Sequence, residues 1–175
     1  MLSIWQRDKF QGMGYDMGTL NHRELLIETI EKYFPFESIL DVGCATGADL
    51  ALIQMVMPTT KRSGFDLSPE NIKEAKEKGV QADIKEGDLR DLLQDMKTDS
   101  VDVVFSNGVI MYVDVDYIKE MVRVARKAVI LSERDPNTKI AQKLDEIGKP
   151  WRLTEVTHGI RDSWGKDGFI YEIMV

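Results

Sequence analysis

Cysteine and histidine are scarce in this sequence. Cys44 is the only cysteine, so no internal disulfide can form, and the two histidines cannot complete a Cys/His metal cluster. No segment has the residue spacing of an EF-hand calcium loop. These absences predict a protein that has no disulfide and binds no metal ion.

Long hydrophobic runs are also missing. No apolar stretch approaches the ~20 residues that span a bilayer. The first ten residues, MLSIWQRDKF, lack the apolar core of a signal peptide. We therefore expect a cytoplasmic protein without a membrane partner.

Positive charge is in deficit. Lysine and arginine number 23 against 30 acidic residues, which gives a formal net charge of −7, and no stripe of basic residues stands out. Nucleic acids and other phosphate-rich partners are therefore disfavoured, although a local basic patch is compatible with this composition.

The sequence does have the composition of a globular protein. Of its 175 residues, 43% are hydrophobic, 30% are charged and only five are prolines. This length suits one domain with a sizeable core and is short for two. We predict one domain over residues 21–175, preceded by an N-terminal arm or lid over residues 1–20 that is flexible or forms a short helix.

Helical and strand-like patterns alternate along this domain. Apolar residues at helical spacing predict helices over 21–34, 47–56, 68–79, 89–96, 115–127 and 135–148. Runs rich in β-branched and aromatic residues predict strands over 38–42, 61–66, 80–87, 100–106, 128–133, 151–159 and 168–175.

This alternation predicts an α/β fold. Helices between strands imply right-handed crossovers, and hence a doubly wound, mainly parallel seven-stranded sheet with helices on both faces. The last two strands have no helix between them, so we expect an antiparallel C-terminal edge hairpin. Ligands of such sheets bind at the carboxyl ends of the strands, near the point where strand order reverses.

Several residues mark the expected helix ends. Asn21 with Glu24 three residues later is typical of a capping box, and Ser68 and Asp88 are typical N-caps. Gly79 is a typical C-terminal stop.

The first predicted strand runs into the small-residue turn DVGCATG. Gly43 and Gly47 would let the backbone turn sharply and approach a ligand closely, although a tight connection without a ligand explains them too. A dinucleotide-binding turn would have glycine at positions 43, 45 and 48, where this chain has Gly43, Ala45 and Ala48. Asp41 would repel a pyrophosphate and attract an ammonium group. Both features argue against a nicotinamide-dependent oxidoreductase.

The same stretch resembles the first motif of class I S-adenosylmethionine-dependent methyltransferases, with Ala45 in place of the middle glycine. The resemblance implies that residues of this turn bind S-adenosyl-L-methionine. We assign Asp41, Gly43, Cys44, Ala45 and Gly47 to that role. Cys44 occupies a variable position of the motif, where we interpret it as a small turn residue and not as a nucleophile.

Later segments resemble further motifs of this family, and the resemblance extends over residues 38–133. In GFDLS, Asp66 would accept hydrogen bonds from the ribose hydroxyls, with Leu67 beside it. In KEGDLRDL, Asp88 would bind the adenine amine and Leu89 would offer a backbone N–H and an apolar contact. Asp88 serves equally well as a plain N-cap.

The segment VDVVFSNGVIMYV resembles the fourth-strand region of the family, which lies under the methionine moiety and the acceptor. On this basis we expect Ser106 and Asn107 to contact the cofactor. For Val109, Ile110 and Met111, packing is the default interpretation.

Methyl transfer needs alignment of donor and acceptor more than a particular catalytic triad. We name Tyr112 and His158 as candidate catalytic residues, since both are expected on the rim at the strand ends. The alternatives are a packed tyrosine and a solvated turn histidine. Further polar and aromatic residues on this rim are Glu133, Asp135, Arg161 and Trp164.

The N-terminal arm carries Trp5 and Tyr15, and His22 follows directly after it. Family resemblance implies that such an arm closes over the cofactor, and we assign Tyr15 to the cofactor site; a mobile terminus is the alternative.

Taken together, these motifs predict a methyltransferase that uses S-adenosyl-L-methionine and modifies an oxygen or nitrogen of a small molecule, as a monomer or homodimer. Two alternatives stay open: a non-catalytic S-adenosylmethionine-binding regulatory subunit, and a methyltransferase acting on protein or tRNA.

Overall fold

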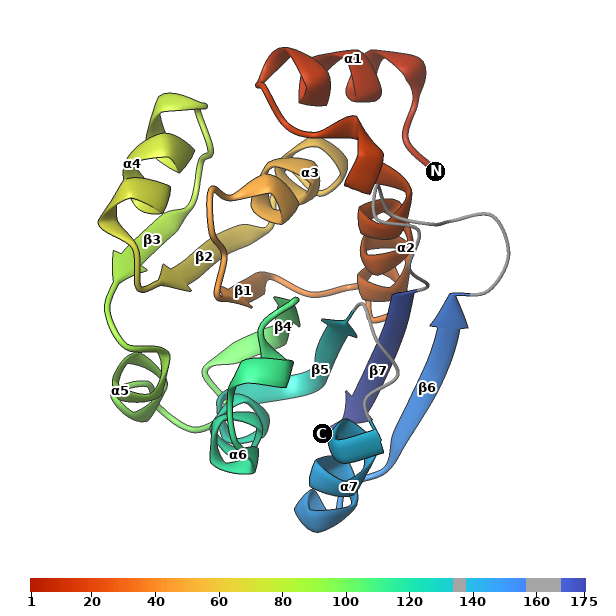
Figure 1. Ribbon diagram of the computed structural model, residues 1–175, viewed down its shortest axis with the longest axis vertical. Coiled ribbons are helices and arrows are strands. Elements are labelled where there is room, and N and C mark those ends of the chain that lie inside the picture. The colour runs from red at the N-terminus through yellow and green to blue at the C-terminus, as the bar shows by residue number, and fades with distance from the viewer. Residues whose placement is uncertain (134–137, 157–167) are drawn as a thin grey trace.

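The computed structural model describes residues 1–133, 138–156 and 168–175. Within them, one seven-stranded sheet runs through the molecule in the order β3-β2-β1-β4-β5-β7-β6 (Figure 1). The strands are β1 Ser38–Val42, β2 Lys61–Asp66, β3 Asp83–Glu86, β4 Val101–Asn107, β5 Ala125–Glu133, β6 Trp151–Val156 and β7 Gly168–Met174.

Helices cover both faces of this sheet (Figure 1). The α-helices are α1 Ile4–Gly12, α2 Leu20–Glu31, α3 Ala48–Val56, α4 Pro69–Glu77, α5 Leu89–Gln94, α6 Val115–Val124 and α7 Thr138–Ile147. Two short 3₁₀ helices are η1 Met17–Thr19 and η2 Ile110–Tyr112.

Strand pairing confirms the predicted fold class. Strands β3, β2, β1, β4 and β5 pair in parallel. Strand β7 lies between β5 and β6 and is antiparallel to both, so the predicted hairpin is present with its second strand on the inside. The strand order reverses between β1 and β4, which marks where the connecting loops diverge and a ligand can enter.

Successive apolar side chains of a strand belong alternately to two hydrophobic cores, one on each face of the sheet. On β4, Val103 and Phe105 belong to the core beneath α1, α2 and α3, whereas Val104 belongs to the core beneath α5, α6 and α7. Ile39 and Leu40 divide in the same way on β1. Because successive side chains of a strand point to opposite faces, each apolar run fills both layers.

The first 20 residues are packed against the domain. Phe10, Tyr15 and Leu20 are buried in the core beneath α2 and α3. The guanidinium of Arg7 pairs with the Glu24 carboxylate at 2.6 Å, which joins α1 to α2. Of the two forms predicted for this segment, the short helix is the observed one.

The predicted capping box at the start of α2 is wrong. Helix α2 begins one residue before Asn21, at Leu20, because η1 leads directly into it and the Leu20 N–H donates to the Met17 carbonyl oxygen. The Glu24 carboxylate accepts from the Leu2 N–H and from Arg7 and does not reach back to close a capping box.

The helix predicted over 115–127 also ends early, at Val124. Ala125 pairs with Val101 of β4, and the chain continues as strand from there, so β5 is three residues longer than predicted. Backbone pairing with a buried strand overrides the helical preference of these residues.

The predicted caps of α4 and α5 are confirmed. The Ser68 hydroxyl accepts from the Asn71 N–H, and the Asp88 carboxylate accepts from the Arg90 N–H at 2.8 Å. Gly79 follows α4 with a positive φ of 76°. No helix of the described residues is long and apolar enough to cross a membrane.

Candidate functional site

The glycine turn, residues 43–47, lies between the carboxyl end of β1 and helix α3. The Gly43 and Cys44 N–H groups both donate to the Phe65 carbonyl oxygen, at 2.9 and 2.8 Å, which fixes the turn to β2. Cys44 is buried, and burial raises the pKa of its thiol. A protonated, enclosed thiol agrees with its interpretation as a turn residue.

Gly43 is required for two independent reasons. Its φ is 83°, a left-handed conformation that side-chain-bearing residues rarely adopt. A Cβ atom at this position would also lie 2.4 Å from Cγ2 of Val109, which follows β4. The close packing of the turn against the β4 loop therefore excludes any side chain.

Ala45 adopts a left-handed φ of 45°, which explains why the corresponding motif position is usually glycine. Its N–H donates to Oδ2 of Asp66 at 2.8 Å. Oδ1 of Asp66 accepts from the Ser68 N–H at 2.9 Å and from Nδ2 of Asn71 at 3.1 Å. Asp66 thus joins the glycine turn to the start of α4, with three of the roughly four acceptor positions of a carboxylate occupied.

Asp41 is the most unusual residue of the site. It is 1% exposed, and among the described residues neither of its carboxylate oxygens has a hydrogen-bond partner. Burial raises the pKa of Asp41 well above its ordinary value, and the negative charges of Asp49 and Asp66 raise it further, whereas Arg23 opposes them. A buried carboxylate without partners is a ready acceptor for a positively charged group.

Arg23 and Asp49 form an ion pair that the sequence did not reveal. A guanidinium nitrogen of Arg23 lies 2.5 Å from Oδ2 of Asp49, which also accepts from Nδ2 of Asn107 at 3.0 Å. Although burial lowers it, the pKa of Arg23 is raised by the carboxylate of Asp49. The available signal was Asp49 itself, the only charged residue in the apolar helix ADLALIQMV.

A polar chain continues from Asn107 to the N-terminal helices. The Ser132 hydroxyl donates to Oδ1 of Asn107 at 3.1 Å and lies 2.6 Å from Nε2 of His22. His22 is therefore buried between α2 and β5, away from the outer surface of the arm. Ser106 was predicted together with Asn107 to contact the cofactor. It is fully buried on β4, and its hydroxyl has no partner among the described residues.

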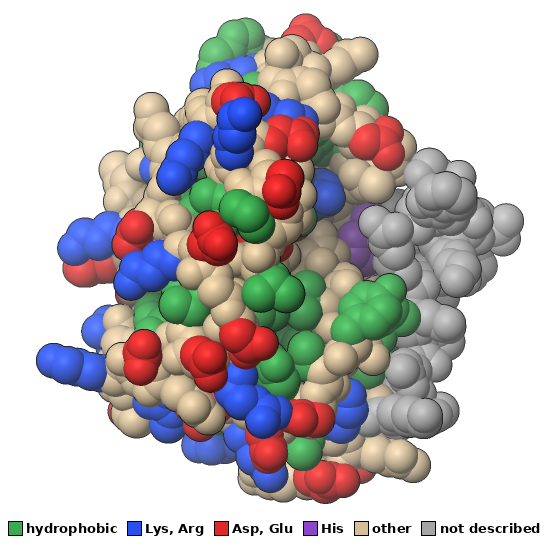
Figure 2. Space-filling model, turned by 60° about the vertical axis from the view of Figure 1, so that its left-hand side comes forward, with side chains coloured by type: hydrophobic (Ala, Val, Ile, Leu, Met, Phe, Trp, Pro, Cys, Tyr) green, Lys and Arg blue, Asp and Glu red, His purple; other side chains and the backbone are tan. Residues whose placement is uncertain are grey.

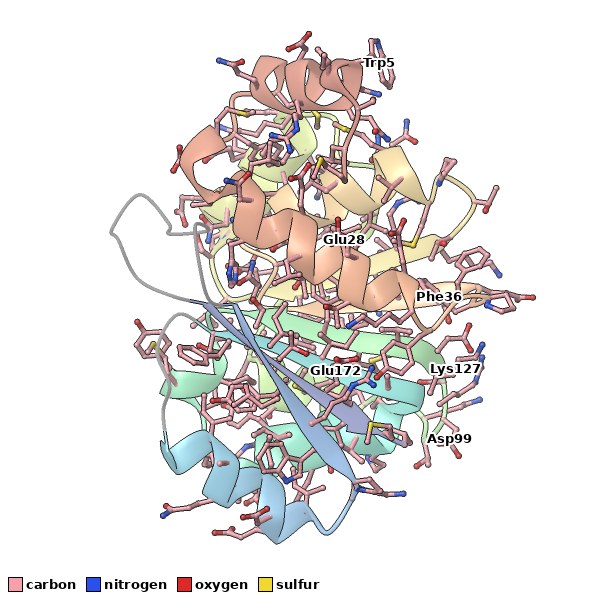
Figure 3. The ribbon with its side chains drawn as sticks, turned by 90° about the vertical axis from the view of Figure 1, so that its right-hand side faces the viewer. Trp5, Glu28, Phe36, Asp99, Lys127 and Glu172 are labelled. Carbon is pink, nitrogen blue, oxygen red and sulfur yellow. The ribbon has the colours of Figure 1, made fainter. Side chains whose placement is uncertain are left out.

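Tyr15 covers the glycine turn. Its hydroxyl donates to the Thr46 carbonyl oxygen at 2.7 Å, and its ring stacks on Phe10 with centroids 4.8 Å apart. The ammonium of Lys78 lies 4.2 Å from the ring centroid, and burial raises the pKa of the phenol. Trp5 is different: it is 66% exposed at the outer end of α1 (Figure 3).

The predicted adenine and ribose residues lie at the ends of β2 and β3. Leu67 is 68% exposed and follows Asp66, while Asp88 is exposed and Leu89 is half-buried at the start of α5. An exposed leucine beside two carboxylates leaves an apolar surface bordered by acceptors at this end of the sheet.

A cavity of about 260 Å³ lies beneath α2, at the carboxyl ends of β4 and β5. Its lining residues are Arg23, Asn107, Gly108, Met111, Tyr112 and Glu133. The side chain of Tyr112 is 81% exposed on its rim, and Met111, for which packing was the expectation, is 38% exposed. Figure 2 shows hydrophobic side chains around a hollow on this face, with acidic side chains beside them.

The structure therefore brings the predicted cofactor residues to one end of the sheet. It places Tyr112 and Glu133 on the neighbouring cavity. The candidates His158, Asp135, Arg161 and Trp164 lie outside the described residues. Among the described residues, no group of three or more His, Cys, Asp or Glu side chains could hold a metal ion.

Comparison with solved structures supports this architecture. A SAM-dependent methyltransferase from Aquifex aeolicus is 18% identical, the match covers 97% of this chain and 98% of that chain, and the TM-score is 0.67. Magnesium protoporphyrin IX methyltransferase from Synechocystis PCC 6803 with bound SAM is 16% identical, with 96% and 90% covered and a TM-score of 0.66. The plantazolicin methyltransferase BpumL, in complex with a desmethylPZN analogue and SAH, is 12% identical, with 97% and 89% covered and a TM-score of 0.71.

A family comparison extends this likeness from fold to sequence. The sequence model of a methyltransferase domain matches residues 35–168. This range includes the glycine turn, Asp66 and Asp88, and the cavity wall that follows β4. Because this match covers most of the chain, the protein belongs to the methyltransferase-domain family.

Proposed function

We propose that this protein transfers a methyl group from S-adenosyl-L-methionine to an oxygen or nitrogen of a small molecule. The observation that carries the proposal is Asp41, a buried carboxylate without hydrogen-bond partners among the described residues, next to a turn that tolerates no side chain at Gly43. An α-ammonium group is a suitable partner for that carboxylate.

The remaining cofactor assignments rest on the strand ends. Asp66 has about one acceptor position to spare, which suits a ribose hydroxyl. Leu67 and Leu89 provide apolar surface for an adenine ring, and Asp88 provides an acceptor for its amine. The glycine turn, with Cys44, Ala45 and Gly47, and the β4 residues Ser106 and Asn107 would surround the methionine moiety, with Tyr15 above the turn.

When bound, S-adenosylmethionine would supply an activated methyl group for the acceptor oxygen or nitrogen, leaving S-adenosylhomocysteine and releasing the acceptor proton to water. The protein's own part is to hold the two reactants in line and to exclude solvent. Tyr112 and Glu133 line the space available to the acceptor, and Tyr112 stays a candidate catalytic residue.

Two solved relatives are named for the compounds that they act on or bind. One acts on magnesium protoporphyrin IX, and another was solved with a plantazolicin analogue, as their names state. We infer a small-molecule acceptor for this chain because its described cavity, at about 260 Å³, is small.

Isothermal titration with S-adenosylhomocysteine tests cofactor binding. Asp41→Asn and Asp66→Asn should each weaken the affinity by about 10- to 100-fold, the scale of losing a charged hydrogen bond. Asp83→Asn is the matched control, since it removes the same charge at an exposed site at the start of β3, and it should bind normally. Unchanged affinity in both site variants would refute the assignment.

Catalysis needs a separate measurement. Formation of S-adenosylhomocysteine from S-adenosylmethionine in the presence of a mixture of small hydroxyl and amine compounds is the expected result. If the protein binds the cofactor and methylates a protein or tRNA fraction but not the small-molecule mixture, the acceptor is a macromolecule and the proposed small-molecule acceptor is wrong. Binding without turnover of either would favour a regulatory subunit.

A further inference from the structure

The cavity beneath α2 presents three side chains that favour aromatic rings. Arg23, Met111 and Tyr112 all lie on its wall. A guanidinium and a phenol ring stack on π faces, and a thioether contacts ring edges. On the basis of the methyltransferase function proposed above, we propose that this cavity is the acceptor site and that the acceptor is a flat aromatic molecule carrying a hydroxyl or amine.

The wall formed by η2 is held firmly from beneath. The Ile110 N–H donates to Oε1 of Glu133 at 2.7 Å, and Ile110 itself is fully buried. The Lys143 ammonium donates to the Val113 carbonyl oxygen, and the Tyr112 N–H donates to the Val109 carbonyl oxygen at 2.9 Å. Met111 and Tyr112 are thus presented by a short helix anchored at both ends, which lowers the entropic cost of binding a rigid ring.

Two exposed large hydrophobic side chains, Met111 and Tyr112, line this cavity. Tyr112 is 81% exposed and Met111 38%, although the rest of the helix η2 is buried. Leu67, 68% exposed, lies at the end of β2 on the side assigned to the adenine. Figure 2 shows the hydrophobic side chains of this face around the hollow. Large side chains exposed next to a cavity mark a ligand site more often than isolated ones do.

Charge in and behind the cavity disfavours an anionic acceptor. Arg23 is the one cation among the described lining residues, and Asp49 already neutralises it at 2.5 Å. Asp41, a second carboxyl group, lies near Arg23 on the side of the glycine turn. A neutral or cationic ring therefore fits this site better than a carboxylate or phosphate.

The size of the cavity restricts the ring system. Its volume of about 260 Å³ lies just below the range of about 300–1,000 Å³ that is typical of drug-sized ligands. One or two fused rings fit such a space, whereas a larger ring system would project over Tyr112 into solvent.

Ternary binding tests this proposal with the 175-residue protein. Phenols and anilines of one and two rings are compared with aliphatic alcohols and amines of equal heavy-atom number, each titrated with and without saturating S-adenosylhomocysteine. The aromatic probes should bind about 5- to 10-fold more tightly. Hydroxybenzoates, which add a carboxylate to the same ring, should bind more weakly than the matching phenols.

Three variants assign the effect to the cavity wall. Tyr112→Ala and Met111→Ala should remove most of the aromatic preference, and Tyr112→Phe should restore it, while the affinity for S-adenosylhomocysteine stays unchanged in each. Leu153→Ala is the matched control, because Leu153 is also a half-exposed apolar residue but lies on the edge strand β6. That control should bind the aromatic probes like the original protein.

The outcomes separate this inference from the function on which it rests. Equal affinity for aromatic and aliphatic probes, or normal aromatic binding in Tyr112→Ala, with S-adenosylhomocysteine bound normally, would overturn the aromatic acceptor and leave the methyltransferase function intact. Aromatic binding that depends on Tyr112 in a protein that does not bind S-adenosylhomocysteine would support the aromatic site and overturn the proposed function.

Discussion

Gly43 combines an unusual backbone angle with a close contact, and the two effects can be separated. Gly43→Ala should destabilise the protein by more than Gly79→Ala, because both glycines have a positive φ but only Gly43 would place its Cβ 2.4 Å from Val109, whereas Gly79 has open space. The left-handed angle alone costs about 1–2 kcal/mol, and overpacking adds a further ~1–3 kcal/mol. Urea unfolding of the two variants measures the difference.

Val109→Ala in the Gly43→Ala background provides the check. It should recover part of the lost stability by removing the clashing methyl groups, and it should leave the cost of the backbone angle. Equal destabilisation by Gly43→Ala and Gly79→Ala would mean that the turn does not pack tightly against the β4 loop.

The buried carboxyl group of Asp41 is expected to lower the stability of the fold while it strengthens cofactor binding. Its pKa is raised by burial, so the folded protein holds the proton more tightly than the unfolded chain, and stability is lost as pH rises through the raised value. Asp41→Asn should therefore be more stable at pH 7, by about 0.5–2 kcal/mol, and bind cofactor more weakly. The advantage should shrink towards pH 4, near the ordinary pKa of aspartate. Chemical denaturation between pH 4 and pH 8 measures it, and an advantage independent of pH would contradict the assignment.

Residues whose role depends on near neighbours were predictable from the sequence. Ser68 and Asp88 cap helices that begin one residue later, so the partners lie within three positions. Arg23 was not predictable, because its partner Asp49 lies on another helix and only the fold brings them together. Asn21 failed because the preceding η1 supplied the acceptor that a cap would otherwise provide.

At the scale of elements, Glu172 fastens the C-terminal strands to α2. It is fully buried on β7 (Figure 3), where Arg152 of β6 donates to both carboxylate oxygens at 2.9 and 2.6 Å. The Tyr33 hydroxyl donates at 3.0 Å, and the Lys32 ammonium lies 3.5 Å away. Although burial alone would raise it, these donors hold the pKa of Glu172 below its ordinary value.

Glu172→Gln should reduce stability at neutral pH by about 1–3 kcal/mol, the scale of hydrogen bonds to a charged group. Because the folded pKa is lowered, the carboxylate's contribution is complete above the unfolded value of about 4.3 and is lost as pH falls below it. The variant and the original protein should therefore converge in stability between pH 5 and about pH 3. A destabilisation of constant size across this range, measured by urea titration, would contradict a role for the charge.

Element boundaries show where local pattern stops being informative. The mainly parallel sheet and the C-terminal antiparallel hairpin were predictable from alternation, yet Ala125 to Lys127 formed strand although their composition suits a helix. Here the competing force is the β4 ladder, which the sequence of the segment itself does not encode. The inner position of β7 was likewise set by pairing between distant segments.

At the scale of the whole molecule, the packing of α1 predicts that the first 20 residues unfold together with the rest. Phe10 is fully buried against Tyr15, so Phe10→Ala should lower the global free energy of unfolding by about 3–5 kcal/mol. Trp5→Ala, on the same helix but mostly exposed, should change it by less than about 0.5 kcal/mol.

Calorimetry and circular dichroism of the β-sheet, both recorded during heating, show whether residues 1–20 unfold with the rest of the protein or separately. A single transition that moves down in Phe10→Ala identifies the segment as part of the cooperative unit. An unmoved main transition, with a new early one in the same variant, would make residues 1–20 a separable lid.

The inner position of β7 has a consequence for how the polypeptide matures. Strand β6 leaves the ribosome before β7, but it joins the sheet only through β7, so it has no ladder partner until residues 168–174 have been synthesised. Up to that moment β5 and β6 both expose unpaired backbone groups, the kind of edge on which nascent chains associate. Deleting residues 168–174 would remove a strand from the interior of the sheet. We therefore expect loss of β7 to increase aggregation during translation more than loss of α1.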